Sequence, residues 1–208
     1  KRGARDFLTK PAPLATIATI AANLMLHDAT RPADARGTDR ILGRSSAAVD
    51  LRTAVRRLAP PTDAQAPTAV LVTGPQGSGK ATVARAVFET AKGDRGPLTE
   101  ADCSLPGPTL DQALDQRHGT ILLRHVEALD AEGQARLMRS LSAPDAPWLL
   151  ATTAANLAKL EREGALRSDL LYRIQVGWID VPALAERNSD ILPIAEAFGV
   201  ALALSVSA

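Results

Sequence analysis

Cysteine is nearly absent from this chain, since Cys103 is the only one among 208 residues. A single cysteine excludes an internal disulfide and a cysteine-rich metal site, and a lone thiol suits a reducing compartment. No apolar run approaches the roughly 20 residues that a helix needs to cross a bilayer, and the first residues lack the layout of a signal peptide. We therefore expect a soluble, cytoplasmic protein with no membrane partner and no metal site built from its side chains alone.

Aromatic residues are also scarce, at 3% of the chain, and the formal net charge is only +1. Basic residues outnumber acidic ones in the first 60 positions, but they are scattered and have almost no aromatic neighbours. A nucleic-acid-binding surface would gather its basic residues on one face or along one helix, so we interpret these residues as a solvated face. The remaining composition, with 46% hydrophobic and 23% charged residues, is that of an ordinary globular domain.

Short apolar segments alternate with segments of helical periodicity along the chain. The apolar segments have the length and β-branching of buried strands, and they cover residues 69–73, 120–123, 148–152 and 174–181. Helices are predicted over residues 12–26, 46–59, 80–91, 130–141 and 156–163. Because strands that alternate with helices build parallel sheets covered on both faces, the sequence predicts an α/β fold.

A glycine-rich turn follows the first of these strands and opens a helix. It reads Gly74-Pro75-Gln76-Gly77-Ser78-Gly79-Lys80 and fits the pattern G-x-x-x-x-G-K. Glycines at this spacing let successive backbone N–H groups point at phosphate oxygens, while the lysine and the helix dipole add positive charge. We therefore predict that residues 74–82 bind ATP or ADP.

The residue after Lys80 departs from the general pattern, which has Ser or Thr there to coordinate Mg²⁺. Ala81 has no side-chain oxygen, and Thr82 stands one position later. We therefore expect phosphate to be held more strongly than Mg²⁺, with nucleotide binding that depends little on the metal.

Three further segments carry a recognisable pattern. Residues 41–46 resemble I-x-G-x-S, residues 166–174 resemble F-R-x-D-L-Y-Y-R-L, and residues 181–191 resemble L-P-P-L-R-E-R-x-x-D-I. Together with the glycine-rich turn, they resemble the central AAA+ domain of bacterial enhancer-binding proteins, the sigma-54-dependent activators. The resemblance implies a P-loop fold of three α/β/α layers with a mostly parallel sheet. It places the nucleotide-binding core over residues 41–188 and the start of a truncated helical lid over residues 189–208.

The resemblance also assigns roles outside the glycine-rich turn. Arg167 and Arg173 match the family's two arginines at the subunit boundary, which implies that they reach the γ-phosphate of a neighbouring subunit. Thr153 occupies the place of the nucleotide-sensing asparagine, and Asn156 is an alternative for that role. The implied partners are further copies of the chain or related AAA+ subunits, and RNA polymerase.

The first residues resemble a different module. Residues 3–11 resemble the end of a response-regulator receiver domain, G-A-x-D-Y-L-x-K-P, and Lys10 matches the lysine that contacts its phosphoryl group. We expect residues 1–27 to be the C-terminal remnant of such a receiver and residues 28–40 to be a linker. The chain would then be a piece of a two-component response regulator, with DNA contacted only by a domain absent from it.

The family pattern breaks where it should supply its acidic groups. Residues 119–126 stand in place of G-T-L-F-L-D-E-I, so Arg124 replaces the Mg²⁺-directing aspartate and His125 replaces the water-polarising glutamate. An arginine there repels Mg²⁺ but can contact phosphate directly. His125 could accept a proton near pH 7, and Glu127 could approach if the strand end bends; otherwise His125 is a hydrogen-bonded strand-end residue. The sequence therefore identifies no catalytic residue.

A second departure is the short distance between Cys103 and Gly119. The family inserts a long hairpin with G-A-F-T-G-A there, which engages the sigma factor, and residues 104–118 contain no such sequence. We therefore expect an oligomeric, ATP-binding regulator of transcription that neither hydrolyses ATP normally nor remodels the sigma-54 polymerase by the usual loop. The alternatives are a slow or partner-completed ATPase, an interaction scaffold that binds no nucleotide, and a decayed or truncated gene product.

Overall fold

The computed structural model describes residues 35–59, 68–91 and 95–206, and the expected receiver remnant at residues 1–27 lies outside them. Five strands form one sheet: β1 (Ala69–Thr73), β2 (Leu98–Asp102), β3 (Thr120–Arg124), β4 (Trp148–Thr153) and β5 (Gly177–Asp180). The longer helices are α2 (Ser46–Leu58), α3 (Lys80–Thr90), α4 (Pro108–Asp115), α5 (Ala131–Leu141) and α8 (Ile191–Val206). Shorter helical segments are α6 (Leu157–Arg162), α7 (Ser168–Ile174), η2 (Gly37–Arg40), η4 (Val126–Ala128) and η5 (Leu184–Asp190).

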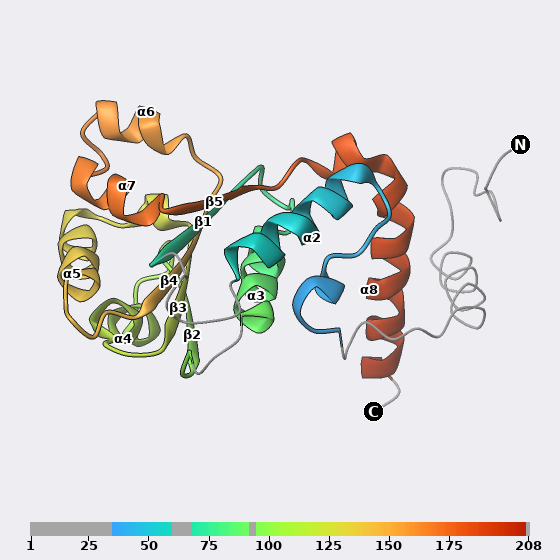
Figure 1. Ribbon diagram of the computed structural model, residues 1–208, viewed down its shortest axis with the longest axis horizontal. Helices are drawn as coiled ribbons and strands as arrows, with labels where there is room; N and C mark the ends of the chain where they lie inside the picture. The colour runs from blue at the N-terminus through green and yellow to red at the C-terminus, as the bar shows by residue number, and fades with distance from the viewer. Residues whose placement is uncertain (1–34, 60–67, 92–94, 207–208) are drawn as a thin grey trace, which may run out of the picture.

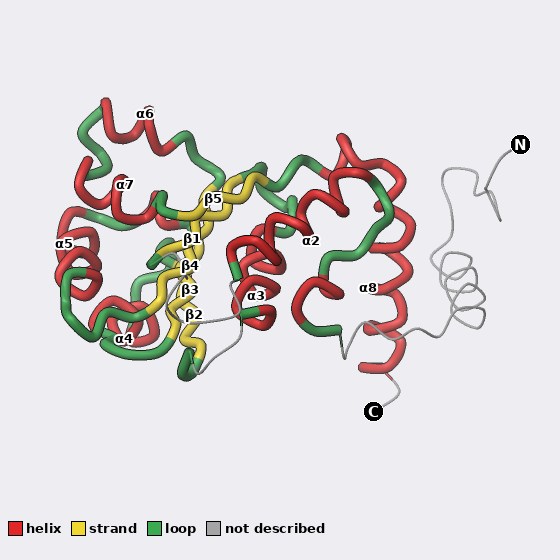
Figure 2. Tube along the Cα trace, in the orientation of Figure 1, coloured by secondary structure: helices red, strands yellow, loops and turns green. Residues whose placement is uncertain are grey.

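The sheet lies in the middle of the molecule with helices on both faces (Figure 1). Its strand order is β2-β3-β4-β1-β5, and every pairing is parallel. Figure 2 shows α4, α5 and α7 on one side of the strands and α2 and α3 on the other. The expected three-layer α/β fold with a parallel sheet is therefore confirmed.

Each face of the sheet has its own hydrophobic core, because successive side chains of a strand point to opposite faces. Leu71 of β1 packs in the core under α4, α5 and α7, whereas its neighbour Val72 packs in the core under α2 and α3. Both side chains are at most 1% exposed. Burial on both faces explains why the central strands read as continuous apolar runs instead of alternating ones.

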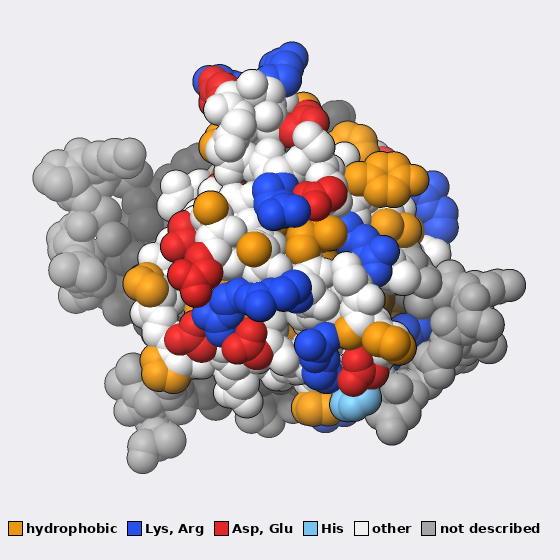
Figure 3. Space-filling model, turned by 90° about the vertical axis from the view of Figure 1, so that its left-hand side faces the viewer, with side chains coloured by type: hydrophobic (Ala, Val, Ile, Leu, Met, Phe, Trp, Pro, Cys, Tyr) orange, Lys and Arg blue, Asp and Glu red, His pale blue; other side chains and the backbone are white. Residues whose placement is uncertain are grey.

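The outer surface of the α4 to α7 layer carries mixed charge. Arg136 of α5 donates to Asp111 at 2.5 Å and to Asp115 at 2.7 Å, both on α4. Figure 3 shows basic and acidic side chains interspersed over the described part of this side of the molecule. Among the described residues, moreover, no helix is both long and apolar enough to cross a membrane.

The structure corrects one predicted strand and adds elements that were not predicted from the sequence. The apolar run at 174–181 does not begin as a strand, because Leu170, Leu171 and Ile174 have helical spacing and bury one side of α7. Only Gly177–Asp180 is extended there. Strand β2 and helix α4 were not predicted, since β2 lies at the sheet edge, is only partly buried and carries Glu100 and Asp102 among its five residues.

Asp190 connects the end of η5 with the residues just before α2. Its carboxylate accepts hydrogen bonds from the backbone N–H groups of Arg44 and Ser45, both at 2.9 Å, and from the Ser45 hydroxyl at 2.5 Å. The hydroxyl of Ser45 also caps α2 by accepting from Ala48 N. Burial alone would raise the pKa of Asp190, but these hydrogen bonds hold it below its usual value. The fully buried carboxylate therefore fixes the start of α2 against the end of η5.

We expect Asp190→Ala to lower the free energy of unfolding by about 2–4 kcal/mol, because it leaves several buried donors without an acceptor. Urea unfolding followed by circular dichroism measures this change. The exposed Asp50 on α2 offers a control, and Asp50→Ala should change stability by less than about 0.5 kcal/mol. Equal effects of the two substitutions would show that Asp190 does not hold the two segments together.

Candidate nucleotide-binding site

The glycine-rich turn lies between β1 and α3, at the carboxyl end of the parallel sheet. Gly79 caps α3 at a φ of 92°, in the left-handed region that favours glycine. A Cβ on Gly74 would lie 2.3 Å from the carbonyl oxygen of Val181, so the backbone of the turn passes too close to β5 for a side chain. Both constraints arise from the sequence pattern, and they produce the loop shape expected of a phosphate cradle.

Lys80 points into this loop and is 8% exposed. Its Nζ donates to the carbonyl oxygens of Gly74 at 2.9 Å and Pro75 at 2.7 Å. Burial lowers the pKa of Lys80, while the negative charge of Glu127 raises it. A buried lysine held by two loop carbonyls is suited to exchange them for phosphate oxygens.

The inside of the loop contains further polar groups. Ser78 is 3% exposed, and its hydroxyl has no hydrogen-bond partner among the described residues. Its carbonyl oxygen accepts a 2.5 Å hydrogen bond from the guanidinium of Arg187, which lies in η5 and is 7% exposed. Pro75 and Gln76 form the exposed outer part of the loop. A buried hydroxyl without a partner in a loop of this sequence pattern fits a phosphate ligand.

Ala81 and Thr82 occupy the first turn of α3, directly behind Lys80, and both are partly exposed. Among the described residues, the Thr82 hydroxyl makes no hydrogen bond. The structure leaves Ala81 without any group that could coordinate a cation.

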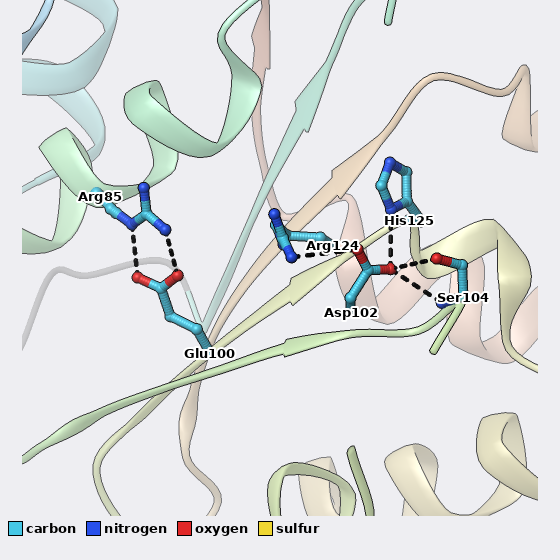
Figure 4. Close-up of polar contacts among 6 residues, drawn as sticks. All are labelled: Arg85, Glu100, Asp102, Ser104, Arg124 and His125. Atoms are coloured by element: carbon cyan, nitrogen blue, oxygen red, sulfur yellow. Dashed lines mark hydrogen bonds and ion pairs between the residues drawn. The ribbon is translucent and has the colours of Figure 1, made fainter. Parts of the chain in front are cut away.

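Arg124 and His125 both turn toward the neighbouring strand β2 (Figure 4). Nη2 of Arg124 lies 3.2 Å from Oδ2 of Asp102, and Nδ1 of His125 lies 2.9 Å from Oδ1 of the same carboxylate. Asp102 also accepts from the Ser104 hydroxyl at 2.6 Å. Arg124 therefore forms an ion pair with Asp102 and His125 a hydrogen bond, and the interpretation of His125 as a hydrogen-bonded strand-end residue agrees with this geometry.

The Asp102 network has a pronounced effect on its carboxyl group. Burial alone would raise the pKa of Asp102, but hydrogen bonds from Ser104 and His125 lower it to about 2. Asp102 therefore stays charged at neutral pH and balances the basic groups around it.

Thr153 lies at the carboxyl end of β4 and pairs in register with Thr73, the residue before the glycine-rich turn. Its side chain is fully buried, and its hydroxyl accepts from the backbone N–H of Ala155 at 3.0 Å. Asn156, the alternative sensor, instead caps α6 by accepting from Lys159 N. The structure thus brings Thr153 to the site edge and gives Asn156 a structural role.

Arg167, the N-cap of α7, and Arg173 within α7 do not join this site. Arg167 pairs with Asp169 through two hydrogen bonds of 3.0 and 2.7 Å, and its side chain is 50% exposed. Arg173 donates to the carbonyl oxygen of Leu141 and lines a hollow with Ala69, at the amino end of β1. The glycine-rich turn follows the other end of this strand, roughly 16 Å away for five residues. Arg173 therefore faces away from the phosphate loop of its own chain.

Three side chains that shape the site were not identified from the sequence. Asp102 was not identified because strand β2 was not predicted, although the sequence has an aspartate directly before Cys103. Arg187 and Asp190 belong to the segment 181–191 that carried the family pattern, but a pattern does not tell which of its members contact the loop. Their structural roles appear only when distant segments are brought together.

Known proteins resemble this chain in sequence and in structure. The family model described as the sigma-54 interaction domain matches residues 42–184 of this chain. The response regulator protein PilR of Pseudomonas aeruginosa is 29% identical over 230 residues, which cover 94% of this chain and 50% of that protein. The DNA-binding transcriptional regulator NtrC of Azospirillum brasilense is 28% identical, covering 92% of this chain and 47% of its own length.

A solved structure of NtrX from Brucella abortus in complex with ATP superposes with a TM-score of 0.63 at 26% identity. The match covers 95% of this chain and 54% of NtrX. The chain thus spans about half the length of the relatives it matches.

We expect the network around Asp102 to make stability depend on pH. The folded pKa of about 2 lies below the roughly 3.9 of an unfolded aspartate, so its contribution is complete above about pH 4 and is lost as the pH falls toward 2. The wild type should therefore be more stable than Asp102→Asn at pH 6, and the difference should shrink near pH 2. Urea unfolding across this range, with Asp39→Asn as an exposed control, tests the prediction; a difference that does not vary with pH contradicts it.

Proposed function

The chain belongs to the family of the sigma-54 interaction domain, and from this premise we propose that it is an ATP-binding module of a cytoplasmic transcription regulator of the response-regulator type. The observation that carries the proposal is the glycine-rich turn with its buried Lys80. The loop lies at the carboxyl end of a parallel sheet and at the start of α3, where the backbone and the helix dipole favour bound phosphate. The ATP complex of NtrX supports the same ligand for a related fold.

We further propose that bound ATP is hydrolysed slowly at most. Phosphoryl transfer needs a group that orients the attacking water and charges that stabilise the transition state. At the end of β3 these positions hold Arg124 and His125, and both are engaged by Asp102. ATP binding would then act as a structural or assembly signal, and ATP hydrolysis would not drive the protein's activity.

The segment between β2 and α4 bears on how such a regulator contacts the transcription machinery. Strand β2 ends at Asp102 and α4 begins at Pro108, so only a tight connection joins them. There is no room in it for a projecting hairpin like the family's sigma-contacting loop. We propose that any contact with RNA polymerase uses another surface, and that DNA is contacted only through a domain outside this chain.

A partner-completed ATPase is the second candidate, and the placement of Arg173 favours it. Its position at the amino end of β1 prevents it from reaching its own phosphate loop but suits a contact with an adjacent subunit. Arg167 lies on the same helix and is half exposed. In a ring with a competent relative, this chain would supply arginines without hydrolysing ATP itself.

Lys80→Ala should weaken ATP binding at least about tenfold, because it removes a charge-assisted contact to phosphate worth more than about 1.5 kcal/mol. Isothermal titration calorimetry of the full chain with ATP measures the loss. Lys159→Ala removes the same charge from an exposed ion pair on α6 and should leave the affinity unchanged. If the wild type does not bind ATP at all, the proposed function is wrong and the scaffold interpretation remains.

Arg173→Ala should leave the chain's own ATP affinity unchanged and should reduce its ATP-dependent self-association. The reason is that Arg173 lies far from its own loop, and in this second candidate function it contacts the nucleotide of a neighbouring subunit. Sedimentation velocity with and without ATP detects the change, and Arg139→Ala on the exposed side of α5 is the matched control. If the isolated Arg173→Ala monomer lost affinity for ATP, Arg173 would act on its own nucleotide, and its proposed contact with a neighbouring subunit would be wrong.

A further inference from the structure

Glu127 is an acidic side chain near the phosphate loop that the network at the end of β3 does not use. It lies in the η4 turn directly after His125, and its Oε1 accepts a 3.2 Å hydrogen bond from the backbone N–H of Ala154, just beyond β4. Its other oxygen, Oε2, is buried and has no hydrogen-bond partner among the described residues. A buried carboxylate oxygen without a donor is costly, and it calls for a ligand.

The path of the backbone explains how Glu127 reaches this place. His125 has a φ of 54°, which is uncommon for a residue other than glycine and turns the chain sharply at the end of β3. The turn buries Val126 completely and places Glu127 against the end of β4. In the sheet order, β4 lies between β3 and β1, and the phosphate loop follows β1. Because Glu127 is held at the end of β4, it lies one strand closer to this loop than the end of β3 does. Arg124 and His125 point the other way, toward β2 (Figure 4).

The electrostatics of Lys80 agree with this placement. Glu127 is the one charged side chain, among the described residues, whose field is felt by Lys80 and raises its pKa. The two do not form an ion pair, because Nζ of Lys80 is bonded to the carbonyl oxygens of Gly74 and Pro75. The carboxylate and the ammonium group therefore face the same region without neutralising each other by contact.

We propose that Glu127 is the carboxylate that receives the divalent cation accompanying ATP in this chain, in place of the acidic residues missing at positions 124 and 125. The proposal rests on the proposed function, since the cation would arrive with the nucleotide. Mg²⁺ is commonly held by one or two carboxylates together with substrate phosphates and water. The described residues contain no cluster of three or more His, Cys, Asp or Glu side chains, so phosphate oxygens must complete the ligand set.

This assignment separates metal binding from hydrolysis. Glu127 would hold the cation beside the phosphates, and the chain would still lack an acidic group at the position that orients water, because His125 is turned to Asp102. The chain would then bind MgATP in preference to free ATP and would retain it. The proposal differs from the expectation from sequence, which was nucleotide binding that depends little on the metal.

The test compares ATP affinity in Mg²⁺ and in EDTA for the full chain, by calorimetry. We expect Mg²⁺ to raise the affinity of the wild type about tenfold, in line with the effect of a single ligand or supporting residue on metal affinity. Glu127→Gln should abolish this gain and leave the affinity in EDTA unchanged, because the amide oxygen can still accept from Ala154 N. Mn²⁺ titrated into the ATP-bound protein and followed by electron paramagnetic resonance should bind more tightly to the wild type than to Glu127→Gln.

Glu132→Gln on the exposed side of α5 removes the same charge and is the matched control, and thermal melting confirms that each variant is folded. A Mg²⁺ gain that persists in Glu127→Gln, or that is missing from the wild type while ATP still binds in EDTA, overturns the assignment of Glu127 and leaves the proposed function intact. Failure of the wild type to bind ATP in either condition overturns both.

Discussion

The contact between Asp190 and the backbone of Arg44 and Ser45 is the constraint on which the rest of the structure depends. A fully buried carboxylate that accepts from two N–H groups and a hydroxyl fixes their positions closely, since moving any one donor leaves the buried charge with one hydrogen bond fewer. Three residues earlier, Arg187 donates to the carbonyl oxygen of Ser78. One short segment thus holds both the start of α2 and the phosphate loop. The shape of the loop therefore depends on residues more than 100 positions away in the sequence.

At the end of β3, charge is balanced within the sheet edge. Arg124 and His125 both reach Asp102 on the adjacent strand, Arg124 as an ion pair and His125 through a hydrogen bond. The side chain of Asp102 is only 11% exposed, whereas those of Arg124 and His125 are 40% and 39% exposed, so the carboxylate is the buried member of the network. Arg124 is consequently not simply available to phosphate, which was one interpretation open from sequence. The replacement of acidic by basic residues at β3 has its counterpart in an acidic residue on β2.

Sequence alone predicted the features that depend on local pattern. The central strands and the glycine-rich turn follow from apolar runs, β-branching and glycine spacing, which act over a few residues. The edge strand β2 was missed because its polar residues serve contacts with Arg85 and Arg124 that only the tertiary fold brings near. The same limit applies to Glu127. The sequence allowed this side chain to approach the site only if the end of β3 bends. Whether it bends is decided by the packing of Val126 and the hydrogen bond of His125, which no local pattern contains.

The conformation of His125 determines where Glu127 lies. A residue with a side chain in the left-handed region costs about 1–2 kcal/mol relative to the usual one. Here the cost is offset by the complete burial of Val126 and by the hydrogen bond from the imidazole to Asp102. A glycine at position 125 would remove the strain but also the imidazole, and Asp102 would lose one of its partners. The turn and the charge network therefore stabilise each other, and the position of Glu127 beside β4 is a consequence of both.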